Sequence, residues 1–459
     1  MGLVRKSKRS LKIRVNKQVL LKKSESALLS AIPFILGLGL LLSISTNLRM
    51  AAFPVGPGEL LLAVLAVVGV IYGKLWRIWK TPVVLFWLFA AVGMLQGALF
   101  ATQKGSLATH HAMAYAFTGA VTIGLFALMT ALSDAALRRV IYWLCTFTAI
   151  GLWFGFVVYL SGDADLAKQL YMPDAGDVRY SGWSINPNQL ALFFVPLPVW
   201  VAALWRDVSN PTRWQMACFA LLLFALMLMG LLVRSDGLFV VWVFEFVILI
   251  MLRLRWEMKA SRMSLLGYAL VMVLCVFLVK TFAHGEVRKS VRCAVETLSQ
   301  GEGLWSAKCY DGQAFKDQEA FRIGYSDPVE KTGVRQELWK NGFQAWLESP
   351  LFGHGPGEYS WHSIGPDGGH SEIMESHNIT IDLLTQGGLL AGGAWIALVS
   401  YLLINAWRIR DSYTFSVVLM MAAFTFFHNT RQPYFWFVLA MSYEAIRRKL
   451  FVSHASDKA

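Results

Sequence analysis

The feature that most constrains this chain is a series of long apolar runs. A bilayer hydrocarbon core of about 30 Å needs roughly 20 predominantly apolar residues per helix. Hydrophobic residues make up 56% of the 459 residues, which is far above the average for a soluble domain. The sequence therefore predicts an all-α polytopic membrane protein with about twelve transmembrane helices, at residues 27–47, 59–76, 82–101, 111–132, 139–161, 188–205, 214–233, 237–254, 263–283, 377–406, 413–428 and 434–448.

These runs divide the chain into five parts. A basic segment at residues 1–26 precedes nine predicted helices within 27–283, and one large extramembrane segment follows at 284–376. Three more predicted helices lie within 377–448, before a short tail at 449–459. The sequence contains no phosphate-binding glycine loop, no dinucleotide fingerprint and no metal-type cysteine cluster, which argues against an ATP-driven pump.

Basic residues alternate along the chain and predict its orientation. The first 26 residues are rich in Lys and Arg, and every second connection between the apolar runs is basic as well. Cytoplasmic loops of membrane proteins show this bias, so we predict cytoplasmic termini and a 284–376 segment that lies outside the cytoplasm. We interpret the net charge of +13 as topology signals and contacts to anionic lipids, not as a nucleic-acid surface. The first run has the length of a membrane anchor and lacks a cleavage site.

The two cysteines of the predicted external segment are Cys293 and Cys309. In an oxidising compartment they either form a disulfide or remain free thiols, and their spacing does not decide between the two. The other cysteines lie in apolar runs, where we expect them to pack as small hydrophobic residues.

Polar residues gather in the connections on the predicted external side. The connection before the sixth helix reads "RYSGWSINPNQ", and the tight connection after the seventh reads "VRSDGLF". Within the large segment, "VRQELWKNGFQAWLESPLFGHGPGEY" predicts a helix that ends near Pro350 and a glycine-rich turn after it. The tenth helix begins with "ESHNITIDLLTQGG". The candidate site residues on this side are Arg179, Asn188, Arg234, Arg335, His377, Asn378 and Arg431.

These pieces, in this order, resemble the O-antigen ligase and O-antigen polymerase superfamily of bacterial envelope glycosyltransferases. The resemblance lies in the Asn-Pro-Asn and Arg-Ser-x-Gly elements, in Arg…Trp…Pro-Leu-Phe-Gly-x-Gly, and in His-Asn followed after nine residues by Gly388. The family usually has a second glycine three positions later, where this chain has Ala391. The resemblance covers most of the chain in architecture. It implies a GT-C-like helical bundle in the bacterial inner membrane with one large periplasmic loop.

The resemblance also implies the substrates. The donor would be an oligosaccharide linked through a diphosphate to undecaprenol, and the acceptor a second lipid-linked glycan, lipid A–core or a protein hydroxyl. A flippase and a chain-length regulator would be partners, and no cofactor is implied. Arginine binds phosphate oxygens in a bidentate manner, and fixed cations stabilise the charge that grows on a leaving diphosphate. Such cations can replace a metal, and a histidine near neutral pKa suits proton removal from the acceptor hydroxyl.

We therefore predict His377 as the general base, with Arg234 and Arg335 at the diphosphate. The predicted substrate-binding residues are Arg179, Asn188, Asn378 and Arg431. Positions 377, 384, 388 and 391 share one helical stripe of mostly small residues, which predicts that His377 faces the bundle interior. Gly388 and Asp382 are interpreted as structural, and we expect Asp382 to hydrogen-bond with Asn378. The alternative for His377 is an interfacial residue without chemistry, and for Arg234 an arginine that extends along apolar surface to water.

The main interpretation is an inverting, metal-independent membrane glycosyltransferase. We favour a polymerase of O-antigen or exopolysaccharide because "TQGGLLAG" departs from the ligase-like glycine pattern, while lipid A–core ligase and protein glycosylation stay open. A transporter of lipid-linked sugars is the alternative of another class. It suits Glu245 in the eighth run, although we expect a structural partner for that carboxylate, and the sequence lacks an obvious matched pair of Gly/Pro-broken helices. A purely structural membrane protein would tolerate loss of His377.

Overall fold

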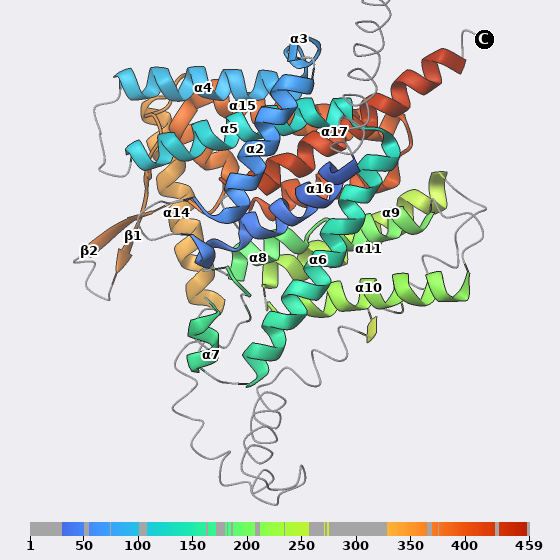
Figure 1. The fold of residues 1–459 in the computed structure, drawn as a ribbon. Coiled ribbons are helices and arrows are strands. Elements are labelled where there is room, and N and C mark those ends of the chain that lie inside the picture. Colours follow the sequence, from blue (N-terminus) through green and yellow to red (C-terminus); the bar gives the residue numbers. More distant parts are fainter. Residues whose placement is uncertain are drawn as a thin grey trace, which may run out of the picture.

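The computed structural model describes sixteen stretches of the chain. They are residues 30–49, 55–73, 75–100, 108–161, 164–170, 180, 182–184, 187–206, 212–233, 235–256, 270, 273–274, 328–364, 370–374, 376–426 and 431–456. Most of them are helices that lie side by side, with α14 and a β-hairpin at one end and the C-terminal end of α17 at the other (Figure 1).

The described elements have the following bounds. An apolar helix, Ser30–Ile44, is followed by a 3-10 helix η1 (Thr46–Leu48). The helices after it are α2 (Pro57–Tyr72), α3 (Leu75–Ile78), α4 (Pro82–Phe100), α5 (Ala108–Ala131), α6 (Asp134–Ser161), α7 (Ala164–Gln169), α8 (Pro187–Phe194), α9 (Leu197–Arg206), α10 (Arg213–Leu232), α11 (Asp236–Trp256), α14 (Pro328–Glu348), α15 (Ile379–Arg408), α16 (Ser412–Phe424) and α17 (Pro433–Ser456). The strands are β1 (Ser360–Ile364) and β2 (His370–Met374).

Six spans among the described residues are long and apolar enough to cross a membrane, which confirms the prediction of a polytopic membrane protein. Three shorter apolar helices and the more charged α11 and α17 also coincide with predicted runs. The ninth run, 263–283, lies almost wholly outside the described residues, so the count of twelve stays a prediction. The six spans are Pro82–Phe100, Ala108–Ala131, Asp134–Val158, Pro187–Trp205, Arg213–Leu232 and Ile379–Arg408.

An aromatic cluster joins three of the helices in the bundle core. The rings of Phe86 in α4 and Trp436 in α17 stack at 4.6 Å, and Trp395 of α15 meets Trp436 edge-on at 5.7 Å. Trp87, the neighbour of Phe86, approaches Trp436 at 4.8 Å. Such ring pairs contribute about 0.5–1.5 kcal/mol each beyond their buried area. They fix α15 between α4 and α17.

Close approach between α4 and α15 depends on glycine. A Cβ atom added to Gly93 of α4 would lie 2.2 Å from the carbonyl oxygen of Gly387 in α15, which no real side chain tolerates. Small residues at such crossings let helix backbones pack directly, which matters in a membrane because lipid tails give helices no hydrophobic reason to associate. Helix α15 therefore packs closely against a neighbouring helix, as we predicted. The glycine at this contact with α4 is Gly387, whereas Gly388 of the predicted stripe contacts Leu351.

The sixth predicted helix is broken. It forms α8 and α9, separated by Val195 and Pro196, where we expected one helix over 188–205. Proline lacks the backbone N–H of a helix interior and disfavours helical geometry in the residue before it. The chain resumes at once, because the Trp200 N–H donates to the Pro196 carbonyl at 3.0 Å. Together with the kink in α15 described below, this gives two broken helices where the sequence suggested none.

The bundle is helical as predicted, and the described part of the large segment adds a β-hairpin that we did not predict. Strands β1 and β2 pair antiparallel, with Ser360 opposite Met374 and Ile364 opposite His370. The hairpin projects from the bundle beside α14 (Figure 1). Helix α14 ends at Glu348, two residues before Pro350, as the sequence predicted. Leu338 of α14 is fully buried, whereas Phe343 is 46% exposed, so only part of its apolar face packs on the protein.

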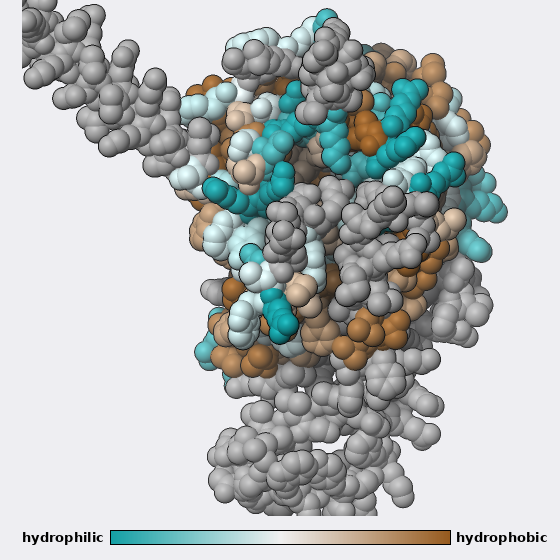
Figure 2. Space-filling model, turned by 90° about the vertical axis from the view of Figure 1, so that its right-hand side faces the viewer, coloured by the Kyte–Doolittle hydropathy of each residue, from teal (hydrophilic) through white to brown (hydrophobic). Residues whose placement is uncertain are grey.

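The opposite end of the bundle carries ion pairs. Arg448 of α17 contacts the carboxylates of Glu444, at 2.7 Å, and of Asp134 at the start of α6. Lys449 pairs with Asp411, the cap of α16, at 2.7 Å. Figure 2 shows this end from outside, with hydrophilic residues gathered in its upper half. Basic residues that we interpreted as topology signals thus also tie α6, α16 and α17 together.

Candidate functional site

The first turn of α15 is fixed by hydrogen bonds on both sides of His377. Asn378 caps the helix, because its Oδ1 accepts from the backbone N–H groups of Thr380 at 3.0 Å and Ile381 at 3.3 Å. Asp382 reaches back to Ser376, whose hydroxyl and backbone N–H donate to Oδ1 at 2.7 and 3.1 Å. Asn378 and Asp382 therefore do not pair through their side chains as we predicted. Each instead fixes the turn that presents His377.

His377 itself has an unusual backbone conformation. Its φ is 53°, in the left-handed region that non-glycine residues seldom adopt. Burial lowers the pKa of His377, the charge of Arg335 lowers it further, and Glu358 raises it. These effects favour the neutral imidazole near pH 7, which is the form that accepts a proton. Left-handed residues held by surrounding hydrogen bonds occur frequently at functional sites.

A glycine-rich turn at residues 350–357 fills a kink in α15. Gly388 interrupts the helix with φ 60° and ψ −157°. The Leu389 N–H donates to the Pro350 carbonyl at 2.8 Å, and the N–H groups of His354 and Gly355 donate to carbonyls of α15 at 2.8 and 2.9 Å. The turn thus satisfies backbone groups that the kink removes from the helix, as is required inside a membrane protein.

Only glycine fits at the kink. A Cβ atom on Gly388 would lie 2.2 Å from the carbonyl carbon of Leu351, and its φ is unfavourable for other residues. Gly353 has φ 67° and contacts the same part of α15. The "PLFGHGPGEY" segment and Gly388 are therefore parts of one structural unit, although about 35 residues separate them in the sequence.

Glu358 follows this turn and comes close to a histidine of α5. Its Oε1 lies 3.5 Å from Nε2 of His111, whose side chain is 2% exposed. Seven residues later in α5, the Thr118 hydroxyl donates to the backbone carbonyl of Arg431 at 2.7 Å. Helix α5 therefore supports both the glutamate and the connection before α17.

The charges at this end of the bundle act on one another. Burial lowers the pKa of Arg431, whereas Tyr115 of α5 and Glu358 raise it. Glu358 acts in the same direction on His377, which Arg335 of α14 opposes. A guanidinium remains protonated through shifts of this kind. His377 thus interacts electrostatically with an arginine and a glutamate, and the same glutamate interacts with a second arginine.

Three of the predicted site residues belong to this cluster: His377, Arg335 and Arg431. Asn378 adjoins it as the helix cap, and Asp382 and Gly388 shape its backbone. Asn188 is half-buried near the start of α8, which begins at Pro187, and the contacts above do not include it. Arg179, Arg234, Cys293 and Cys309 lie outside the described residues.

Glu358 and His111 did not enter our sequence-based site. Glu358 stands directly after Gly357, so its position behind the glycine-rich turn was the available signal. His111 lies in the fourth apolar run, more than 240 residues away in the sequence, and only packing of α5 shows its proximity. Among the described residues, no group of three His, Cys, Asp or Glu side chains has the arrangement of a metal site. The Nε2 of His354 lies 2.7 Å from the Ala345 carbonyl, with which it hydrogen-bonds.

The fold and this site define a polytopic membrane protein with a charged, partly buried cluster at one end of its helical bundle. Residues 219–396 match the model of the family described as O-antigen ligase. This match covers less than half of the chain, and it confirms the resemblance to the O-antigen ligase and polymerase superfamily that we predicted from the motifs. The matched range includes Arg234, Arg335 and His377, whereas Arg179, Asn188 and Arg431 lie outside it. No curated protein matches the chain.

Proposed function

We propose that the protein is an inverting, metal-independent glycosyltransferase that polymerises or ligates undecaprenyl-diphosphate-linked glycan at the periplasmic face of the inner membrane. The observation that carries the proposal is the charged cluster of His377, Arg335, Arg431 and Glu358 at the start of α15. The family match supports an activity of this type. Whether the acceptor is a lipid-linked glycan, lipid A–core or a protein hydroxyl depends on a pocket that these residues do not specify.

In the proposed reaction, an acceptor hydroxyl attacks the anomeric carbon of the donor sugar. A carbon–oxygen bond forms to the acceptor while the bond from that carbon to the diphosphate breaks. The hydroxyl proton passes to His377, and the electron pair of the broken bond stays on the leaving undecaprenyl diphosphate. The new glycosidic bond has inverted configuration because attack and departure occur on opposite faces of the sugar.

The neutral imidazole of His377 suits the role of base. Burial and Arg335 both lower its pKa, which keeps it unprotonated at neutral pH. Glu358 limits that effect and would stabilise the imidazolium formed during the reaction. Because hydrogen bonds of Ser376, Asn378 and Asp382 hold this turn, the backbone that carries His377 is fixed before substrate binds.

The arginines suit the diphosphate. Negative charge on the leaving group grows in the transition state, and fixed guanidinium groups in a partly buried site stabilise it more strongly there than in the ground state. Arg335 and Arg431 are the arginines of the cluster that we propose to contact the diphosphate. We propose that Arg234 joins them. Arg179 and Asn188 are proposed to contact the donor or acceptor glycan.

The test uses purified full-length protein with undecaprenyl-diphosphate glycan and an acceptor. His377→Ala should bind the donor but stop transfer, so that lipid-linked glycan accumulates. Arg335→Lys keeps the charge but loses the planar fork, and should reduce transfer roughly tenfold to a hundredfold. Lys340→Gln, which removes an exposed charge from the same helix, is the matched control. Full transfer by His377→Ala, or inhibition of the wild type by EDTA, would contradict the proposal.

A transporter of lipid-linked sugars is a second candidate, and two observations favour it. Glu245 of α11 is fully buried, and neither of its carboxyl oxygens has a hydrogen-bond partner among the described residues, contrary to the structural partner we expected. Broken helices such as α8–α9 and α15 are also typical of transporters. However, the break at Gly388 is filled by the glycine-rich turn. Movement of lipid-linked glycan across proteoliposomes without transfer, abolished in Glu245→Gln, would establish this candidate.

A further inference from the structure

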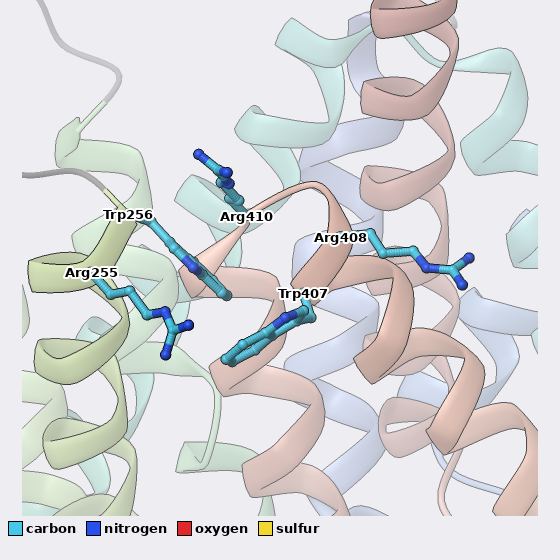
Figure 3. A pocket seen from close by; sticks show the side chains of 5 residues that line it. All are labelled: Arg255, Trp256, Trp407, Arg408 and Arg410. Atoms are coloured by element: carbon cyan, nitrogen blue, oxygen red, sulfur yellow. The ribbon is translucent and has the colours of Figure 1, made fainter.

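A second charged site lies at the other end of α15. Arg255 and Trp256 at the end of α11, and Trp407, Arg408 and Arg410 at the end of α15, line an open pocket of about 370 Å³ (Figure 3). Helix α15 has 30 residues, so at 1.5 Å per residue its two ends are about 45 Å apart. The pocket is therefore separate from the His377 cluster and lies on the face that we predict to be cytoplasmic.

Two tryptophans form the wall of this pocket. The rings of Trp256 and Trp407 meet edge-on at 4.9 Å, and the Arg255 guanidinium lies over the Trp407 ring at 5.5 Å. Trp407 remains 43% exposed. Tryptophan is enriched at headgroup depth in membrane proteins, and an arginine over its ring is oriented without being neutralised.

The arginines of the pocket have no carboxylate partner in the part of the chain that the structure describes. Among the described residues, no Asp or Glu forms an ion pair with Arg255, Arg408 or Arg410. Asp411, the neighbour of Arg410, is already bound by Lys449 at 2.7 Å. At the same end of the bundle, Arg447 and Arg448 are both paired with Glu444. The arginines of the pocket thus keep their positive charge without a described carboxylate, whereas Arg447 and Arg448 nearby are neutralised by Glu444.

The backbone at Arg410 is in the left-handed region, where a turn without another role usually has glycine. Its φ is 53°, and its N–H donates to the Trp407 carbonyl at 3.1 Å while the Asp411 N–H donates to the Ala406 carbonyl at 2.9 Å. This pair of bonds closes many helix ends, and the residue in the left-handed position is usually glycine. An arginine occupies it here, which is unfavourable for the turn alone.

We propose that this pocket binds the phosphate of an anionic phospholipid headgroup from the cytoplasmic leaflet. Arg255 and Arg410 would contact the phosphate, and the two tryptophans would pack against the glycerol and upper acyl region. In Figure 3 the guanidinium of Arg410 points outward beside Trp256, and that of Arg408 points away from the pair beyond Trp407, so Arg408 contributes less. Basic pockets between membrane helices on this side are suited to anionic headgroups, which zwitterionic lipids match poorly. The proposal rests on the predicted orientation and not on the proposed glycosyl transfer.

The experiment is native mass spectrometry of the detergent-purified full chain, titrated separately with phosphatidylglycerol, phosphatidylcholine and inorganic phosphate. We expect binding of phosphatidylglycerol, weakened roughly fivefold in Arg255→Gln and again in Arg410→Gly. Arg410→Gly is informative because glycine suits the turn, so lost binding there does not reflect misfolding. Arg139→Gln removes an exposed charge from α6 at the same end of the bundle and is the matched control.

The outcomes separate the alternatives. Equal binding by wild type, Arg255→Gln and Arg410→Gly would overturn the site, as would an equal loss in Arg139→Gln. Equal affinity for phosphatidylcholine and phosphatidylglycerol would show that the negative charge of the headgroup does not determine binding, and would contradict the proposal. Binding of inorganic phosphate without preference for phosphatidylglycerol would show that the ligand is a soluble phosphate and not a lipid.

Discussion

The two ends of α15 have the same backbone irregularity and different surroundings. His377 before the helix and Arg410 after it both have φ 53°, and they are the two non-glycine residues with positive φ in the described part of the chain. Side-chain bonds from Ser376, Asn378 and Asp382 enclose the turn at His377, whereas the backbone N–H groups of Arg410 and Asp411 close the turn at Arg410. The comparison teaches that the same conformation presents a side chain either into a buried site or toward solvent.

The charge environment differs in the same way. His377 is mostly buried, and charges of both signs, from Arg335 and Glu358, act on its pKa. Arg410 is exposed beside Arg255 and Arg408, and none of the three forms an ion pair with a described residue. Opposed charges in a partly desolvated site tune a proton transfer, while exposed charges of one sign attract an anion. We therefore assign chemistry to the first end and lipid binding to the second.

The largest expected effect comes from making the same substitution at both ends. Glycine relieves the left-handed φ at either position, so His377→Gly and Arg410→Gly should unfold at the same temperature as the wild type or above it. His377→Gly should nevertheless lose transfer by roughly 10²–10⁴-fold, because the base is gone. Thermal unfolding in detergent and the transfer assay check both points. If His377→Gly transferred glycan at the normal rate, neither end of α15 would have a role in the proposed chemistry.

The second effect concerns the kink that gives the His377 end its shape. Gly388→Ala introduces a Cβ atom against Leu351 at a positive φ, and should destabilise the folded protein by about 2–4 kcal/mol. Gly393→Ala is the control, because a Cβ atom there meets nothing within 4 Å. Thermal unfolding of the two variants in detergent measures the difference. Similar stability would mean that the turn at 350–357 does not hold the kink.

A smaller effect is expected in the pH dependence of transfer. Glu358 raises the pKa of His377, so Glu358→Gln should lower it and move the acid limb of the pH–rate profile to lower pH. Arg335 lowers the same pKa, so Arg335→Gln should move that limb to higher pH, in addition to its loss of rate. The profile of transfer rate against pH between pH 5 and 8 measures both. If the acid limb moved in the same direction for both variants, titration of His377 would not be the cause of that limb.

The smallest effect is at the helix cap. Asn378→Ala removes the acceptor for the Thr380 and Ile381 N–H groups and should cost about 1 kcal/mol of stability, which Asn378→Ser should largely restore. If Asn378 also binds substrate, the serine variant will regain stability but not transfer. Unfolding temperature and transfer rate, measured on the same preparations, distinguish capping from binding.

Local patterns in the sequence determined the membrane class, the positions of most helices and the start of the site. The positions of the membrane helices could be predicted because hydropathy over 20 residues depends only on the local sequence. The end of α14 could be predicted because Pro350 stops the helix. The family motifs likewise singled out His377, Arg335 and Gly388 as candidates without coordinates. These features need no knowledge of which helices are neighbours.

Only the tertiary structure decided which distant residues meet. His111 reaches Glu358 because α5 packs beside the glycine-rich turn, and the Arg410 pocket exists because α11 and α15 end side by side. The partner of Asp382 is Ser376 and not Asn378, because the hydroxyl and the N–H of Ser376 both donate to its carboxylate while the Asn378 side chain caps the helix. Each outcome depends on the packing of elements separated in the chain, and a hydrophobic period constrains which face a helix buries but not what that face meets.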